Sequence, residues 1–139
     1  MRIDIPDQKK LVCELRLPIR WGDMDAMGHV NNVAYFRYME TVRVEWLVSV
    51  GAAPDASGEG PVIANTFCNY LTQLEYPGEL LAKLFLANAG RSSFDMFLTL
   101  ERIDQPGKVC ATGGATTVWI DFPQQKAVPL PQWLRGLIG

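Results

Sequence analysis

One stretch of this chain has the apolar spacing of a long helix. Between residues 33 and 50 the apolar side chains recur in steps of three and four, at Val33, Phe36, Met39, Val42, Trp46, Leu47 and Val50. Asn31 or Asn32 can cap the first turn, because the asparagine side chain accepts a hydrogen bond from a free backbone amide. Gly51 suits the position after the last turn. The spacing therefore predicts a single helix of about 18–20 residues.

The segments on either side of this helix have the pattern of strands. Residues 11–19 alternate between apolar and polar side chains, which indicates a half-buried strand. After a loop at 52–61, four further strands are predicted at 62–74, 79–90, 93–101 and 109–122. Turn residues separate them, and the short connections favour antiparallel neighbours. Gly113 and Gly114, inside the last strand, indicate a bulge or a close backbone approach.

A single long helix must bury its apolar stripe, and the sheet is the only partner large enough to cover it. We therefore expect an α+β fold in which a curved antiparallel sheet wraps around one long central helix. The chain of 139 residues has the size of one ordinary domain, so residues 1–139 are expected to form a single unit.

Charge and composition exclude several classes of function. The net charge of −2 argues against a general nucleic-acid or anionic-membrane binder, since such proteins carry a basic excess. His29 is the only histidine, so a metal site with several histidines is excluded and no metal is expected. Cys13, Cys68 and Cys110 are widely spaced and predicted to be inert core thiols, which fits a reducing cytoplasm. No secretory leader is visible in the first residues.

The segment from Arg20 to Arg43, RWGDMDAMGHVNNVAYFRYMETVR, is the most informative of the chain. It resembles the hotdog-fold acyl-CoA thioesterases of the 4-hydroxybenzoyl-CoA thioesterase type. That family has a D-x-D-x-x-G motif followed by Y-x-x-x-x-E-x-x-R, and the matching positions here are Asp23, Asp25, Gly28, Tyr35, Glu40 and Arg43. One branch of the family has H-V-N-N after the glycine, as at residues 29–32. A shorter match is the G-R-S-S turn at residues 90–93.

The resemblance implies thioester hydrolysis, with Asp25 as the catalytic carboxylate and Asn32 at the amide that polarises the carbonyl. Physical chemistry agrees, because an ionised carboxylate can attack a thioester carbonyl or activate water. The free amides of a helix N-terminus can stabilise the oxyanion that forms. The sequence leaves open whether Asp25 is the nucleophile or the general base.

The implied substrate is an acyl-CoA, and coenzyme A enters as part of that substrate rather than as a cofactor. Arg91, Ser92 and Ser93 are expected to hold part of it, since a guanidinium pairs with phosphate and hydroxyls donate hydrogen bonds. In this fold class the site lies at a dimer interface, so Arg91 is expected to serve Asp25 of a neighbouring subunit. A homodimer or homotetramer is therefore expected. The sequence leaves open whether acyl carrier protein replaces CoA.

Structural roles compete with these assignments. Asp23 is expected to hold the loop through hydrogen bonds, and Glu40 and Arg43 are expected to form an ion pair three residues apart on the helix. His29 is a candidate either for a direct catalytic role or for orienting Asp25.

Two other functions stay open. One is a hotdog hydratase or dehydratase, which would use His29 but lacks the H-F-P-x-x-P setting of those enzymes. The other is a non-catalytic acyl-thioester binding protein.

Overall fold

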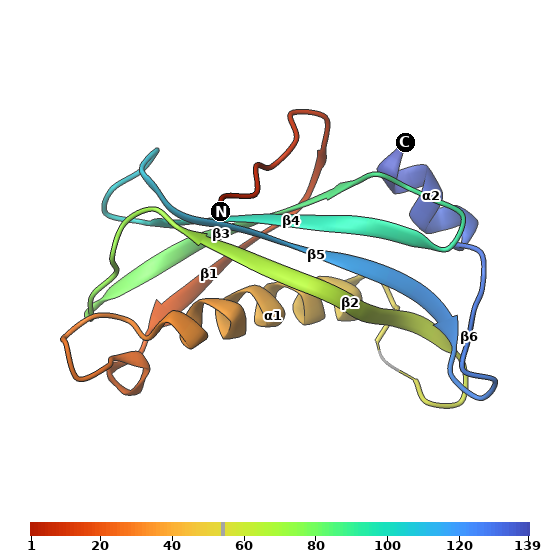
Figure 1. The fold of residues 1–139 in the computed structure, drawn as a ribbon, viewed down its shortest axis with the longest axis horizontal. Helices are drawn as coiled ribbons and strands as arrows, with labels where there is room; N and C mark the ends of the chain where they lie inside the picture. The colour runs from red at the N-terminus through yellow and green to blue at the C-terminus, as the bar shows by residue number, and fades with distance from the viewer. Residues whose placement is uncertain (54) are drawn as a thin grey trace.

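The computed structural model describes residues 1–53 and 55–139. Within them one antiparallel sheet has the strand order β1-β3-β4-β5-β2, and the short β6 pairs with β5 (Figure 1). The strands are β1 (Lys10–Ile19), β2 (Glu59–Tyr70), β3 (Gly78–Ala87), β4 (Ser93–Arg102), β5 (Val109–Asp121) and β6 (Lys126–Ala127). The predicted strand before the helix and the four predicted antiparallel strands after it are present, and the two-residue β6 was not predicted.

The boundaries of β2 differ from the prediction of a strand at 62–74. The strand begins at Glu59 and includes Gly60 and Pro61, which the composition had assigned to a loop. Proline is tolerated here because β2 is an edge strand, where a missing amide donor breaks no ladder on the open side. The strand ends at Tyr70, because the amides of Leu71 and Thr72 both turn to the carbonyl of Cys110, at 2.9 and 3.1 Å.

The predicted long helix is α1 (Asn32–Ser49), which lies across one face of the sheet (Figure 1). Asn31 is its N-cap, and the Asn31 side chain accepts a hydrogen bond from the Val33 amide. At the other end Gly51 has φ +78, a conformation that favours glycine. Two shorter helical segments, η1 (Trp21–Asp23) and α2 (Gln132–Ile138), accompany this long helix.

The core lies between α1 and the sheet. Alternate residues of β3 and β4 are fully buried. They are Leu80, Ala82, Leu84, Leu86, Phe94, Met96, Leu98 and Leu100. Gly113 marks a close approach, because a side chain there would overlap the Met39 side chain of α1.

The expected ion pair between Glu40 and Arg43 is absent from the described residues. Arg43 lies on the buried side of α1 with only 8% of its surface exposed, whereas Glu40 is exposed. Burial lowers the pKa of the Arg43 guanidinium, and the Glu40 carboxylate offsets part of that effect. Two residues three apart on a helix can form an ion pair, but Arg43 lies on the face of α1 that packs into the core.

The pairing of β1 with β3 fixes the two ends of the sheet. Ile19 lies opposite Gly78, and Lys10 lies opposite Leu86. The loop that follows β1 is therefore at one end, and the turn between β3 and β4 is at the other (Figure 1). Since β3 has 10 residues, these ends are about 30 Å apart. Among the described residues, no helix is long and apolar enough to cross a membrane.

Candidate active site

Asp25 lies in the loop between η1 and α1, and its carboxylate is held on one side only. Its Oδ1 accepts hydrogen bonds from the Met27 amide at 2.8 Å and from the His29 amide at 3.2 Å. The Asp25 amide donates to the His29 carbonyl at 2.7 Å, which closes the loop, and Gly28 takes φ +80 within it. Asp25 is exposed, and Oδ2 has no hydrogen-bond partner within residues 1–53 and 55–139. One carboxylate oxygen is thus fixed, and the other is available to a ligand.

Asp23, two residues earlier, has the structural role expected for it. Its Oδ2 accepts from the Tyr38 hydroxyl at 2.7 Å and from the Arg20 amide at 3.0 Å. Its carbonyl accepts from the Asn31 amide at 2.8 Å. Burial and, secondly, the bond to Asp23 raise the pKa of the Tyr38 hydroxyl, so Tyr38 remains a donor. Asp23 therefore ties the loop to α1.

The start of α1 presents a free amide close to this loop. Asn31 caps the helix through the Val33 amide, at 2.9 Å. The Asn32 amide, at the first helical position, has no hydrogen-bond partner among the residues that the structure describes. The carbonyl of Asn32 accepts from the Tyr70 hydroxyl at 2.8 Å, so β2 holds the helix start from the other side. Free amides at a helix N-terminus favour a developing negative charge.

An open groove of about 440 Å³ joins these groups. Asp25, His29 and Asn32, the three candidate catalytic residues, all line it, together with Tyr35, Tyr70 and Thr72. The ring of Tyr70 meets that of Tyr35 edge-on, with centroids 4.9 Å apart. On its other side Asp25 borders a second hollow of about 480 Å³, whose walls include the exposed rings of Trp21 and Tyr76.

His29 touches Asp25 through its backbone, and its ring is directed to a different carboxylate. Its Nε2 lies 3.7 Å from Oε1 of Glu75, and 29% of the His29 side chain is exposed. The backbone amide and carbonyl of His29 both bond to Asp25. His29 thus contacts Asp25 through backbone atoms, and its ring faces an acid from the segment after β2.

The residues expected to hold CoA lie at the other end of the sheet. Arg91 is exposed, and Ser92 and Ser93 are half-buried, in the turn between β3 and β4. The Arg135 guanidinium of α2 holds this turn, donating to the carbonyls of Gly90 at 2.7 Å and of Arg91 at 3.2 Å. Within one chain the structure does not bring this turn together with Asp25.

Sequence reasoning missed the far wall of the groove. Tyr70 and Thr72 of this wall, and Glu75 beside the His29 ring, come from the end of β2 and the loop after it, about forty residues from the Asp25 loop. No local pattern marks them, because they reach the site only when β2 pairs with β5. Across the described ranges, no group of three or more His, Cys, Asp or Glu side chains could hold a metal ion.

Comparison with known proteins gives consistent results. The model of the thioesterase-like superfamily matches residues 19–138. A solved structure of a proposed thioesterase from Pseudomonas aeruginosa is 32% identical with a TM-score of 0.89, covering 94% of this chain and 100% of that chain. A proposed acyl-CoA thioesterase from Xanthomonas campestris is 34% identical with a TM-score of 0.74, covering 80% and 94%.

A chloroplast acyl-acyl carrier protein thioesterase of Arabidopsis thaliana is 30% identical over 128 residues. The match covers 88% of this chain and 65% of the plant protein, so the chain spans just under two thirds of that relative.

Proposed function

The chain belongs to the thioesterase-like superfamily, and we propose that it hydrolyses acyl-CoA thioesters with Asp25 as the catalytic carboxylate. One observation carries this proposal: Asp25, which keeps one carboxylate oxygen free, and Asn32, which keeps its amide free, line the same groove. A thioester in this groove would have its carbonyl carbon near a carboxylate and its carbonyl oxygen near a donor. Those are the two groups that thioester hydrolysis needs.

The reaction has two possible routes at Asp25. As a general base, Oδ2 takes a proton from water, and the water oxygen adds to the carbonyl carbon. As a nucleophile, Oδ2 adds to that carbon itself and forms an anhydride, which water then hydrolyses. In both routes the C–S bond breaks, the sulfur leaves as coenzyme A thiolate, and the products are free acid and CoA. The Asn32 amide stabilises the oxyanion in each case.

Binding of the CoA portion is proposed to require a second subunit. Arg91, Ser92 and Ser93 are about 30 Å from Asp25 of the same chain, by the length of β3. Strands β1 and β2 are the edges of the sheet and can pair with another copy. We therefore propose a homodimer or homotetramer in which one subunit's Arg91 serves the other subunit's Asp25.

A cytoplasmic location is proposed because all three cysteines are free thiols, which fits a reducing compartment. We also propose that residues 1–139 act as one domain and that the enzyme needs no cofactor.

One contact favours a second candidate function. The 3.7 Å contact between His29 and Glu75 is a histidine–acid pair, which a hydratase or dehydratase of acyl thioesters could use. The acid of this pair, Glu75, comes from the loop after β2.

Release of free thiol from a panel of straight, branched and aromatic acyl-CoAs tests the proposal. An acyl-acyl carrier protein and a 2-enoyl-CoA complete the panel. The proposal predicts CoA release from at least one acyl-CoA and no hydrated product from the enoyl-CoA. Thiol release from the acyl-acyl carrier protein alone would show that the substrate is an acyl-acyl carrier protein and not an acyl-CoA. Hydration of the enoyl-CoA without thiol release would establish the second candidate, and binding without turnover would contradict both.

A further inference from the structure

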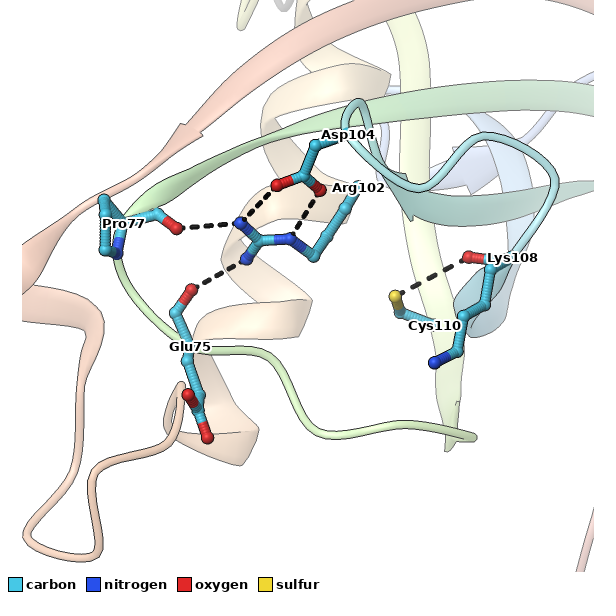
Figure 2. A network of polar contacts seen from close by, with 6 residues as sticks. All are labelled: Glu75, Pro77, Arg102, Asp104, Lys108 and Cys110. Atoms are coloured by element: carbon cyan, nitrogen blue, oxygen red, sulfur yellow. Dashed lines mark hydrogen bonds and ion pairs between the residues drawn. The ribbon is translucent and has the colours of Figure 1, made fainter.

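Arg102, at the end of β4, holds a loop that none of the sequence motifs includes. Its Nη1 donates to the carbonyl of Glu75 at 2.9 Å, and its Nη2 donates to the carbonyl of Pro77 at 2.8 Å (Figure 2). Only 16% of the Arg102 side chain is exposed. The guanidinium thus spans both sides of Tyr76 and fixes the segment 75–77 against the end of the sheet.

Two neighbours keep the guanidinium in this position. Asp104 accepts from Nε at 2.9 Å and from Nη2 at 3.1 Å, a bidentate pair that raises the pKa of Arg102 (Figure 2). Gly78 provides the space, because a Cβ at this position would overlap the guanidinium atoms. Arg102 is therefore built to hold these carbonyls rather than to reach solvent.

The segment that Arg102 holds, together with Leu74 directly before it, touches the Asp25 loop at three points. The carbonyl of Leu74 accepts from the Val30 amide at 2.8 Å. The Glu75 carboxylate lies 3.7 Å from the His29 ring. The Tyr76 amide points to Sδ of Met24 at 3.3 Å. These contacts lie on both sides of Asp25 in the chain.

The geometry points to Arg102 as a positioning residue for Asp25, acting through the segment 74–77 on the loop that carries the carboxylate. His29 is the link, because its amide and carbonyl both bond to Asp25 while its ring faces Glu75. Arg102 itself is absent from both hollows that Asp25 borders, so it does not contact substrate there. The kinetic test of this inference rests on the proposed function, whereas the structural test does not.

The variant Arg102→Met tests the inference by removing the guanidinium and keeping the aliphatic stem. We expect kcat to fall about 10- to 100-fold, because a small displacement of a reacting group has an effect of that size. KM is expected to stay within about 3-fold of the wild-type value, since the substrate contacts remain. Arg102→Lys, which can still reach one carbonyl, is expected to lie between Arg102→Met and the wild type.

The matched control is Arg16→Met. Arg16 is an exposed arginine of β1, and within the described part of the chain its side chain pairs with Glu79 alone, at 3.6 Å. It takes no part in either hollow, so kcat should equal that of the wild type. Gly78→Ala is a second test, because it leaves Arg102 charged and displaces its guanidinium. It should lower kcat in the same way as Arg102→Met.

Two readouts separate positioning from general stabilisation. In an Asp25→Asn background, Arg102→Met should cause no further loss of the residual rate, because the group that it positions is already inactive. Hydrogen exchange of the Val30 amide, which donates to Leu74, should be at least about 10-fold faster in Arg102→Met than in Arg16→Met.

Unchanged kcat and unchanged Val30 exchange in a folded Arg102→Met protein would overturn the inference. If Arg102→Met does not fold, the same two measurements on Arg102→Lys and Gly78→Ala decide. A wild-type protein that hydrolyses no thioester would contradict the proposed function alone, because Val30 exchange would still test Arg102.

Discussion

At the scale of single residues, the two oxygens of the Asp25 carboxylate differ in their hydrogen bonds. Oδ1 accepts hydrogen bonds from the amides of Met27 and His29, and Oδ2 has no partner among the described residues. Asp23 has the reverse arrangement, because the Tyr38 hydroxyl and the Arg20 amide share its Oδ2. The two aspartates of one motif are thus held differently: Asp23 ties the loop to α1, and Asp25, the proposed catalytic carboxylate, keeps one oxygen free.

Cys68, which the sequence predicts to be an inert core thiol, is a partly buried free thiol. Burial raises the pKa of the Cys68 thiol from 9.0 to about 11, although a bond with Tyr70 partly offsets this. At pH 8 the thiolate fraction is therefore about 100-fold smaller than for an ordinary cysteine. We expect iodoacetamide to alkylate Cys68 correspondingly slowly in the native protein, as measured by peptide mass spectrometry. The chain unfolded in urea is the control, and equal rates in both states would contradict the assignment.

At the scale of elements, the contact of α1 with the sheet depends on Gly113. A Cβ there would overlap the Met39 side chain and lie 2.8 Å from the carbonyl of Phe67. Gly113→Ala should therefore destabilise the protein by about 1–3 kcal/mol, because a packed core absorbs an extra methyl group only with strain. The shift in the urea midpoint measures this effect.

Gly136 offers the matched control for that substitution. It lies in α2 with no atom within 4 Å of an added Cβ. Gly136→Ala should leave stability unchanged or raise it by up to about 1 kcal/mol, since alanine is the better helix former. Equal destabilisation by both substitutions would contradict the packing account.

Much of the fold could be predicted from local pattern, because the spacing of apolar residues and the residue types of turns depend on residues that are close in sequence. That is why α1, the five main strands and the capping by Asn31 were found. The Asp25 loop was found for the same reason, since its motif is continuous. Glu75, Tyr70 and Arg102 could not be found, because β-sheet pairing alone brings them to the site. The burial of Arg43 could not be predicted either, because it depends on how α1 packs against the sheet and not on the spacing of residues along the helix.

At the scale of the whole molecule, the two ends of the sheet carry different parts of the proposed site. Arg102 supports the Asp25 loop at one end, and Arg135 supports the Arg91 turn at the other. The distance of about 30 Å between the ends is set by the length of β3. A site shared between two subunits follows if both ends act on one substrate.

Complementation tests the shared site. Asp25→Asn and Arg91→Ala proteins are unfolded together and refolded as a mixture, with each refolded alone as a control. A mixed dimer would contain one site with an intact Asp25 and an intact Arg91. The mixture should then recover up to about a quarter of the wild-type kcat/KM, as random pairing of two-fold dimers allows. Activity no higher than the mean of the two separate variants would show that each chain uses its own residues.

The central claim is that the Asp25 carboxylate performs the chemistry, and its most direct test is kcat of Asp25→Asn. Asparagine keeps an Oδ1 that can accept from Met27 and His29, so the loop is preserved while the charge is lost. Asp55→Asn is the matched control, because Asp55 is an exposed carboxylate whose Oδ1 accepts from the Ser57 amide in a similar turn.

We predict that Asp25→Asn lowers kcat at least about 100-fold, with an unchanged melting temperature, and that Asp55→Asn stays within about 2-fold of the wild type. A folded Asp25→Asn enzyme with full activity would contradict the account.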